Sequence, residues 1–240
     1  MCGRYATTRS AADLSALFEA YDDTGDRLIP DYNVAPTDPV PIVRISDPAG
    51  GSVLSVARWG LLPPWAKDSR GAARMINARA ETVASTRAYA RPFARHRCLV
   101  PADGWYEWVR RKGAKQAYFM TPRNGDVLAF AGLWSVWRGT GTPVLTCNVV
   151  TMAALGELAL VHDRMPLVLP RDRWSEWLSG GDDPAVLLAP PDEESLATIE
   201  IRPVGTDVGD VRNDGPGLVA RVSAAPLRAL PEEAVGLTLF

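Results

Sequence analysis

The feature that most restricts the fold of this 240-residue chain is a series of short apolar or alternating segments separated by turn-forming residues. Segments of this kind, bounded by glycine, proline and aspartate, are typical of β-strands. We expect strands at residues 39–45, 52–60, 117–121, 127–137, 144–151, 166–170 and 199–204. Because predicted strands outnumber predicted helices, we expect an α+β domain built on a curled antiparallel sheet or barrel-like core.

Helical patterns are fewer and predict peripheral elements. Ser10 followed by Asp13 resembles a capping box, and the apolar residues after it recur at helical spacing, so a helix is expected from Ser10 to about Ala20. Further helices are predicted at 81–90, 153–161 and 171–179. The length suits one compact domain over residues 1–240, with a flexible insertion at 179–194 and a peripheral tail at 226–240.

The composition excludes several classes of protein. No run approaches the roughly 18 consecutive apolar residues of a membrane span, and the N-terminus has no apolar signal segment, so a cytoplasmic, monomeric protein without a membrane partner is expected. Three cysteines predict reduced thiols rather than a disulfide framework. His96 and Cys98 lack zinc-ligand spacing, and no phosphate-binding or dinucleotide motif is present, so neither metal nor cofactor is expected.

Basic residues are segregated along the chain, although the overall net charge is −2. Between residues 67 and 115, twelve Lys and Arg side chains accompany four acids, a net charge of +8, and the remainder carries −10. Of the 26 basic residues, 23 are arginine, whose planar guanidinium suits phosphate and stacks on bases. The segment favours a nucleic-acid contact, whereas codon bias and a solvated surface are the ordinary explanations of the arginine excess.

Cys2 is the first candidate for chemistry because removal of Met1 would leave it at the N-terminus. An N-terminal cysteine carries an α-amine with a pKa near 7.7 and a thiol near 8.5 on adjacent carbons. The amine can form a Schiff base with an aldehyde, and the thiol can then close a five-membered thiazolidine. Arg4 is expected to lower the pKa of the thiol. An incidental or buried cysteine is the alternative.

Polar residues also stand where predicted strands meet turns. Glu107 lies between Trp105 and Trp108, so burial there would raise its pKa and give an acid able to transfer protons at neutral pH. His162 titrates in that range unaided. Asn77 stands in the segment MINARAET. A turn asparagine, a salt-bridged glutamate and a helix-capping histidine are the structural alternatives.

An aromatic loop, RWGLLPPWAKD at 58–68, precedes the basic segment. Aromatic side chains beside arginines are how proteins that tolerate any sequence hold unpaired bases. Trp65, flanked by proline and charged residues, is expected to be exposed, whereas Trp59 is expected in the core.

Seven blocks of this chain resemble the SRAP family, the SOS response-associated peptidases that crosslink to abasic DNA. They run nearly end to end: MCGRY (1–5), YNVAPT (32–37), RWGLLPPWAKD (58–68), INARAET (76–82), RCLVPADGWYEW (97–108), HDRMPLVL (162–169) and VGDVRNDG (208–215). The resemblance implies a compact α+β domain with a barrel-like core and a channel for single-stranded DNA. Ala154 departs from the pattern, because many relatives have asparagine there.

The resemblance also implies roles for eight residues. The implied catalytic group comprises Cys2 as nucleophile, Asn77 orienting the sugar, Glu107 as proton shuttle and His162 assisting ring opening. The implied DNA contacts are Arg4, Trp65, Arg79 and Thr151.

The function expected from this resemblance is capture of abasic sites in single-stranded DNA through a thiazolidine on Cys2, which shields the lesion during replication and associates the protein with the nucleoid. Self-processing of Met1, a peptidase reaction, and weak strand cleavage by β-elimination, a lyase reaction, are expected alongside. Two alternatives stay open: a non-covalent binding module for single-stranded or modified DNA, and a cysteine peptidase that uses Cys2 with His162.

Overall fold

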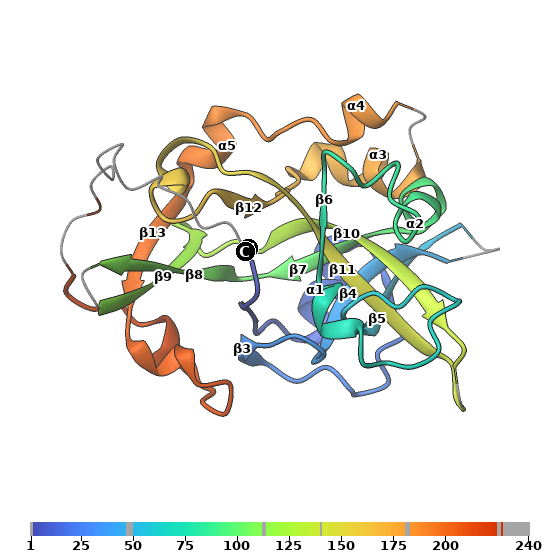
Figure 1. The fold of residues 1–240 in the computed structure, drawn as a ribbon, viewed down its shortest axis with the longest axis horizontal. Helices are drawn as coiled ribbons and strands as arrows, with labels where there is room; N and C mark the ends of the chain where they lie inside the picture. Colours follow the sequence, from blue (N-terminus) through green and yellow to red (C-terminus); the bar gives the residue numbers. More distant parts are fainter. Residues whose placement is uncertain are drawn as a thin grey trace.

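The computed structural model describes residues 2–46, 50–111, 114–139, 141–180, 183–224 and 227. Five strands of its larger sheet form a closed barrel, as expected from the sequence (Figure 1). Four neighbouring pairs are antiparallel, and a short parallel pairing between Thr146 and Arg58 and between Cys147 and Trp59 closes the ring. In ring order the strands are β4 (Pro39–Ile45), β7 (Arg97–Ala102), β10 (Leu128–Trp137), β11 (Val144–Ala153) and β5 (Ser52–Trp59).

A second, fully antiparallel sheet carries the N-terminal residues. Its order is β13 (Ile199–Val204), β9 (Ala114–Pro122), β8 (Gly104–Arg111), β1 (Tyr5–Thr7) and β3 (Asp31–Val34). Three short strands extend the larger sheet: β2 (Tyr21–Asp22), β6 (Asn77–Arg79) and β12 (Arg164–Pro166). Because β1 begins three residues after Cys2 and pairs on both sides, the N-terminal residues are fixed between β3 and β8.

The helices are short and lie at the periphery of the sheets (Figure 1). Ser10 caps the first, accepting a hydrogen bond from the Asp13 amide at 3.1 Å, and this confirms the predicted helix start. The α-helices are α1 (Ala11–Phe18), α2 (Ala90–Arg95), α3 (Trp174–Ser179), α4 (Pro184–Leu187) and α5 (Glu193–Ala197). None of the helices in the described residues is long and apolar enough to cross a membrane.

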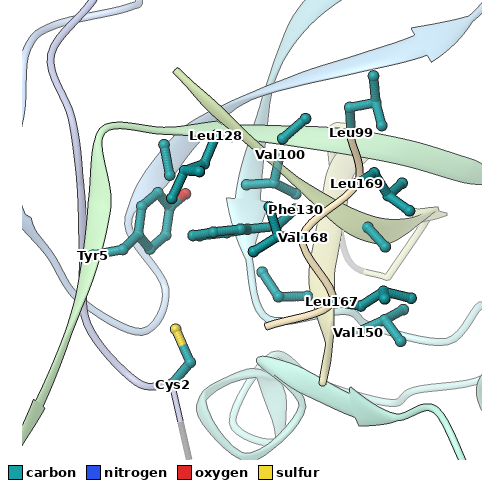
Figure 2. Packing of buried hydrophobic residues seen from close by; sticks show 14 of the residues in the cluster. Cys2, Tyr5, Leu99, Val100, Leu128, Phe130, Val150, Leu167, Val168 and Leu169 are labelled. Carbon is teal, nitrogen blue, oxygen red and sulfur yellow. The ribbon is translucent and has the colours of Figure 1, made fainter. Parts of the chain in front are cut away.

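The core between the two sheets is mainly aliphatic, and the aromatic rings of Tyr5 and Phe130 lie within it (Figure 2). The fully buried Tyr5 ring meets Trp59 and Phe130 edge-on, with centroids 5.0 Å and 6.1 Å apart. Trp59 is fully buried, as expected, and its indole N–H donates to the Ile76 carbonyl at 3.0 Å. Burying one such side chain contributes roughly 2 kcal/mol or more, so this cluster anchors β1 firmly against the barrel.

Gly60 permits the turn that starts the aromatic loop. Its φ of +128° is open to glycine, and a Cβ there would lie 2.5 Å from the Ala72 carbonyl oxygen. A side chain at this position would therefore displace the chain between Trp59 and Trp65.

Several sequence-based predictions differ from the structure. The helix expected at 81–90 is wrong: those residues form turns, and α2 begins only at Ala90. The strand expected at 166–170 is reduced to the end of β12 and a single bridge at Val168. Between 153 and 161 the helix is a short 3-10 turn, Gly156–Leu160. The proposed insertion contains α4 and the start of α5, with 181–182 outside the described residues; of the tail at 226–240, only Leu227 is described.

Candidate functional site

Cys2 lies where β1 approaches the barrel, and the structure joins it to Asn77. The amide Nδ2 of Asn77 donates to the Cys2 carbonyl at 2.7 Å. Asn77 opens β6, which runs parallel to β11, and its own carbonyl accepts from the Tyr89 hydroxyl at 3.2 Å. Its Oδ1 is buried and makes no hydrogen bond with the described residues. Two residues 75 positions apart therefore meet at the N-terminus, with one amide oxygen still able to accept.

The Cys2 side chain is fully buried, with its sulfur directed toward the apolar cluster that contains Phe130 and Leu167 (Figure 2). Burial raises the pKa of this thiol well above its usual value, and the nearby Glu107 carboxylate raises it further. Arg4 acts in the opposite direction only through its backbone N–H. The expected lowering by Arg4 is present in this backbone contact, but desolvation outweighs it, so the pKa of the thiol is raised overall.

Glu107 lies on β8 and is only 4% exposed. Burial raises the pKa of its carboxyl to about 7, which confirms the prediction made from its tryptophan neighbours. Glu107, His162 and Arg164 line the same narrow cleft. A carboxyl that is about half protonated at neutral pH can both give and take a proton there.

His162 precedes β12, and its ring nitrogen Nδ1 accepts a hydrogen bond from the Arg164 backbone N–H at 2.9 Å. Burial lowers the pKa of the imidazole, so the ring is neutral at pH 7. Asp163 Oδ1 also lies 2.7 Å from Nδ1. A hydrogen bond to this carboxylate would require a proton on Nδ1, whereas Nδ1 must be unprotonated to accept from the Arg164 N–H. We favour the backbone contact because the Asp163 side chain is 85% exposed; the proton of the neutral ring is then on Nε2.

Arg164 is a residue that the sequence reasoning missed. Its guanidinium makes an ion pair with Glu81 and donates to the Thr151 carbonyl at 2.6 Å. Its position inside the block HDRMPLVL, two residues after His162, was the available signal. Thr151 itself is fully buried on β11, so its side chain supports Arg164 from within rather than facing solvent.

Of the four expected DNA contacts, Arg79 and Trp65 lie on the surface, whereas Thr151 is fully buried and Arg4 is half buried. Arg79 is exposed at the end of β6, and Trp65 is 53% exposed, as predicted, with the Arg87 guanidinium 5.1 Å from its ring centroid. Arg4 is half buried, and its Nη1 donates to Asn33 Oδ1 at 2.7 Å and to the Val208 carbonyl at 3.0 Å.

A larger groove lies elsewhere on the protein. It has a volume of about 530 Å³ and is lined by residues of α1, α5 and the turn between β9 and β10, and Cys2, Glu107 and His162 do not line it. Within the parts of the chain that the structure describes, no three His, Cys, Asp or Glu side chains cluster as metal ligands would. The candidate site is therefore identified by its chemistry and not by its volume.

Comparison with known proteins places this arrangement in a family. The abasic site processing protein YoaM of Bacillus subtilis is 34% identical over 84% of this chain and 91% of its own length. YedK of Escherichia coli is 31% identical over 92% and 100%, and HMCES of Gallus gallus is 32% identical over 90% and 76%; both bear the same description. A solved structure from Bacteroides thetaiotaomicron shares the fold, with a TM-score of 0.80 over 92% of this chain at 24% identity.

The match to the family itself covers most of the chain. The family described as SOS response associated peptidase (SRAP) matches residues 1–211, which include every candidate residue discussed above. The resemblance found in seven sequence blocks is thereby confirmed, and the chain belongs to the SRAP family.

Proposed function

We propose that this protein processes abasic sites by forming a covalent bond between Cys2, exposed at the N-terminus by removal of Met1, and the sugar of single-stranded DNA. The relatives described as abasic site processing proteins support the lesion as the substrate. The observation that carries the proposal is the contact between Asn77 and the Cys2 carbonyl beside a carboxyl with a pKa of about 7. One aldehyde carbon placed there would meet an amine, a thiol and a proton donor together.

The reaction divides into two bond-forming steps. The open sugar presents C1′ as an aldehyde, and the Cys2 amine adds to it to give a carbinolamine, which loses water to become an imine. The thiol then adds across the C=N bond: the S–C1′ bond forms, and the thiol proton passes to the nitrogen. Protonated Glu107 gives its proton to the ring oxygen as the sugar opens, takes the proton of the anomeric hydroxyl in return, and then assists the loss of water. The Nε2–H of the neutral His162 ring stabilises the ring oxygen by a hydrogen bond.

Burial of the thiol supports this order of steps. Because the pKa of Cys2 is raised, the sulfur is a neutral thiol at pH 7, and a thiolate attack on the aldehyde is disfavoured. The same feature argues against a cysteine peptidase, which depends on an activated thiolate. Weak strand cleavage by β-elimination follows if the imine persists before the sulfur reacts.

DNA binding is assigned to the surface residues near this site. Arg79 supplies charge to a phosphate, and Trp65 with Arg87 forms a stacking platform for an unpaired base. Asn77 Oδ1 accepts a hydrogen bond from a hydroxyl group of the abasic sugar.

A denaturing gel with a single-stranded abasic oligonucleotide tests the proposal. Wild-type protein should give an adduct that survives heat and denaturant, whereas Cys2→Ser should give only an imine that borohydride traps. Cys98→Ser, which alters another fully buried thiol, is the matched control and should retain the stable adduct. A stable adduct from Cys2→Ser at the normal rate would place the bond on another residue.

A further inference from the structure

Arg4 and Asn33 join the N-terminal segment to a distant loop. Arg4 stands two residues after Cys2, and Asn33 lies in β3, the strand paired with β1. Arg4 Nη1 donates both to Asn33 Oδ1 and to the carbonyl of Val208, which is 204 positions away. The two blocks that the reaction itself leaves unexplained, YNVAPT and VGDVRNDG, meet at this contact.

The Asn33 side chain uses both its oxygen and its nitrogen in hydrogen bonds. It is 3% exposed, and its Nδ2 donates to the carbonyls of Asp210 at 2.9 Å and Asn213 at 2.8 Å while its Oδ1 accepts from Arg4. The neighbouring Tyr32 amide donates to Asp214 Oδ1 at 2.8 Å. The Asn33 side-chain amide therefore holds loop 208–214 against β3, and the loop in turn supports the Arg4 guanidinium through the Val208 carbonyl.

The chain at Arg4 is held on its other side by backbone contacts. The Tyr106 amide donates to the Arg4 carbonyl at 2.9 Å, and Tyr5 pairs with Trp105 on β8, the strand that carries Glu107. Loss of the two Asn33 Nδ2 donors would release loop 208–214, and with it the Val208 carbonyl that holds the Arg4 guanidinium, so the residues before β1 would shift. Cys2 would then move relative to Glu107 and Asn77, which belong to other elements.

We propose that Asn33 is a positioning residue for Cys2, acting through loop 208–214 and through Arg4, whose guanidinium holds the N-terminal segment in place. This inference rests on the proposed capture reaction. Misplacement of a reacting group by about 1 Å can cost on the order of 100-fold in rate, so a defect here should be seen in chemistry rather than in DNA affinity.

The test uses Asn33→Asp, which keeps an acceptor for Arg4 and removes both donors to the loop carbonyls. Single-turnover capture of an abasic single-stranded oligonucleotide should show a maximal rate lower by about tenfold to 100-fold. The DNA concentration at half-maximal rate and its salt dependence should not change. Asn124→Asp is the matched control, because this exposed amide makes its side-chain hydrogen bonds with Asp126 in a turn, and it should behave as wild type.

A product ratio separates positioning from loss of folded protein. A displaced thiol closes the ring more slowly, so a larger share of captured DNA should end as cleaved strand instead of stable adduct. This share does not depend on how much protein is folded, and the smaller change Asn33→Ser should raise it as well. A wild-type rate and ratio in both variants would overturn the inference, as would changes confined to affinity and salt dependence. Failure of the proposed function is distinguishable, because wild type itself would then form no Cys2-dependent adduct.

Discussion

Replacing Glu107 by Gln gives the sharpest view of the proposed chemistry. The substitution keeps the size and burial of the side chain and removes its ionisable proton. Because the pKa of Glu107 is raised to about 7, about half of the carboxyl is protonated at pH 7, whereas an ordinary carboxyl would hold almost none. Loss of a general acid of this kind typically slows a reaction by about 100-fold to 10,000-fold.

The pH profile of single-turnover capture should report this group. In wild type the rate should rise as the Cys2 amine, with an ordinary pKa near 7.7, loses its proton, and should fall above about pH 7 as Glu107 loses the proton that it donates. Glu107→Gln should be slower and should retain only the rising limb, while the mass of the adduct is unchanged. Glu176→Gln, an exposed residue on α3, should keep the wild-type profile. A falling limb that persists in Glu107→Gln would refute the assignment.

The raised pKa of Glu107 also predicts how the unfolding free energy changes with pH. The folded protein keeps the Glu107 proton up to about pH 7, whereas an ordinary carboxyl loses it near 4.5. The contribution of this group to the unfolding free energy is therefore present below pH 4.5 and falls as pH rises to about 7, by about 3 kcal/mol. Glu107→Gln should unfold at a higher denaturant concentration than wild type at pH 8, and a lower midpoint there would contradict the raised pKa.

The remaining predictions concern the other residues of the site. Cys2→Ser should lose the stable adduct and retain borohydride-trapped imine with slight strand cleavage, both measured on denaturing gels; a wild-type pattern would exclude the thiol. Arg79→Ala should weaken binding of single-stranded DNA and reduce its salt slope by about 0.7, whereas the exposed Arg123→Ala should change neither. Trp65→Ala should cost about 1–3 kcal/mol of binding free energy by fluorescence anisotropy, and Trp65→Phe should recover much of it; equal affinity for all three proteins would argue against stacking.

The regular strands could be predicted because their residues alternate or form apolar runs bounded by turns. The segment at 39–45 coincides with β4, and the segment at 199–204 coincides with β13. The stretch 166–170 failed for a physical reason. The backbone N–H of Leu167 donates to the Val150 carbonyl on β11, and that of Leu169 donates to the Ala129 carbonyl on β10. The hydrogen bonds of this stretch are therefore divided between two strands, so it does not form a regular strand with either.

The helix predicted at 81–90 failed because hydroxyl side chains compete with helical hydrogen bonds. Ser85 Oγ donates to the Thr82 carbonyl at 3.2 Å. The backbone N–H of Thr82 donates to the Arg79 carbonyl and that of Ser85 to the Thr82 carbonyl, each three residues earlier, as in successive turns. An apolar stripe is not evident in this segment, so tertiary contacts decide its shape.

The site could be predicted in part for a related reason. Cys2 was identified by its position after Met1, and the raised pKa of Glu107 by its tryptophan neighbours. The network around them depends on contacts that local patterns do not carry, such as Arg4 with Val208 or Arg164 with Glu81. Burial of the Cys2 thiol, which raises its pKa, follows only from the assembled barrel and is not evident from the residues next to it in the sequence.

The most direct test of the central claim is the intact mass of the purified protein mixed with a single-stranded abasic oligonucleotide and then treated with borohydride. The account predicts one product that lacks Met1 and has the mass of the mature protein plus the oligonucleotide minus one water. Borohydride should leave that mass unchanged, because a closed thiazolidine has no C=N bond to reduce. An adduct that retains Met1, or one that gains two hydrogens with borohydride, would contradict ring closure on Cys2.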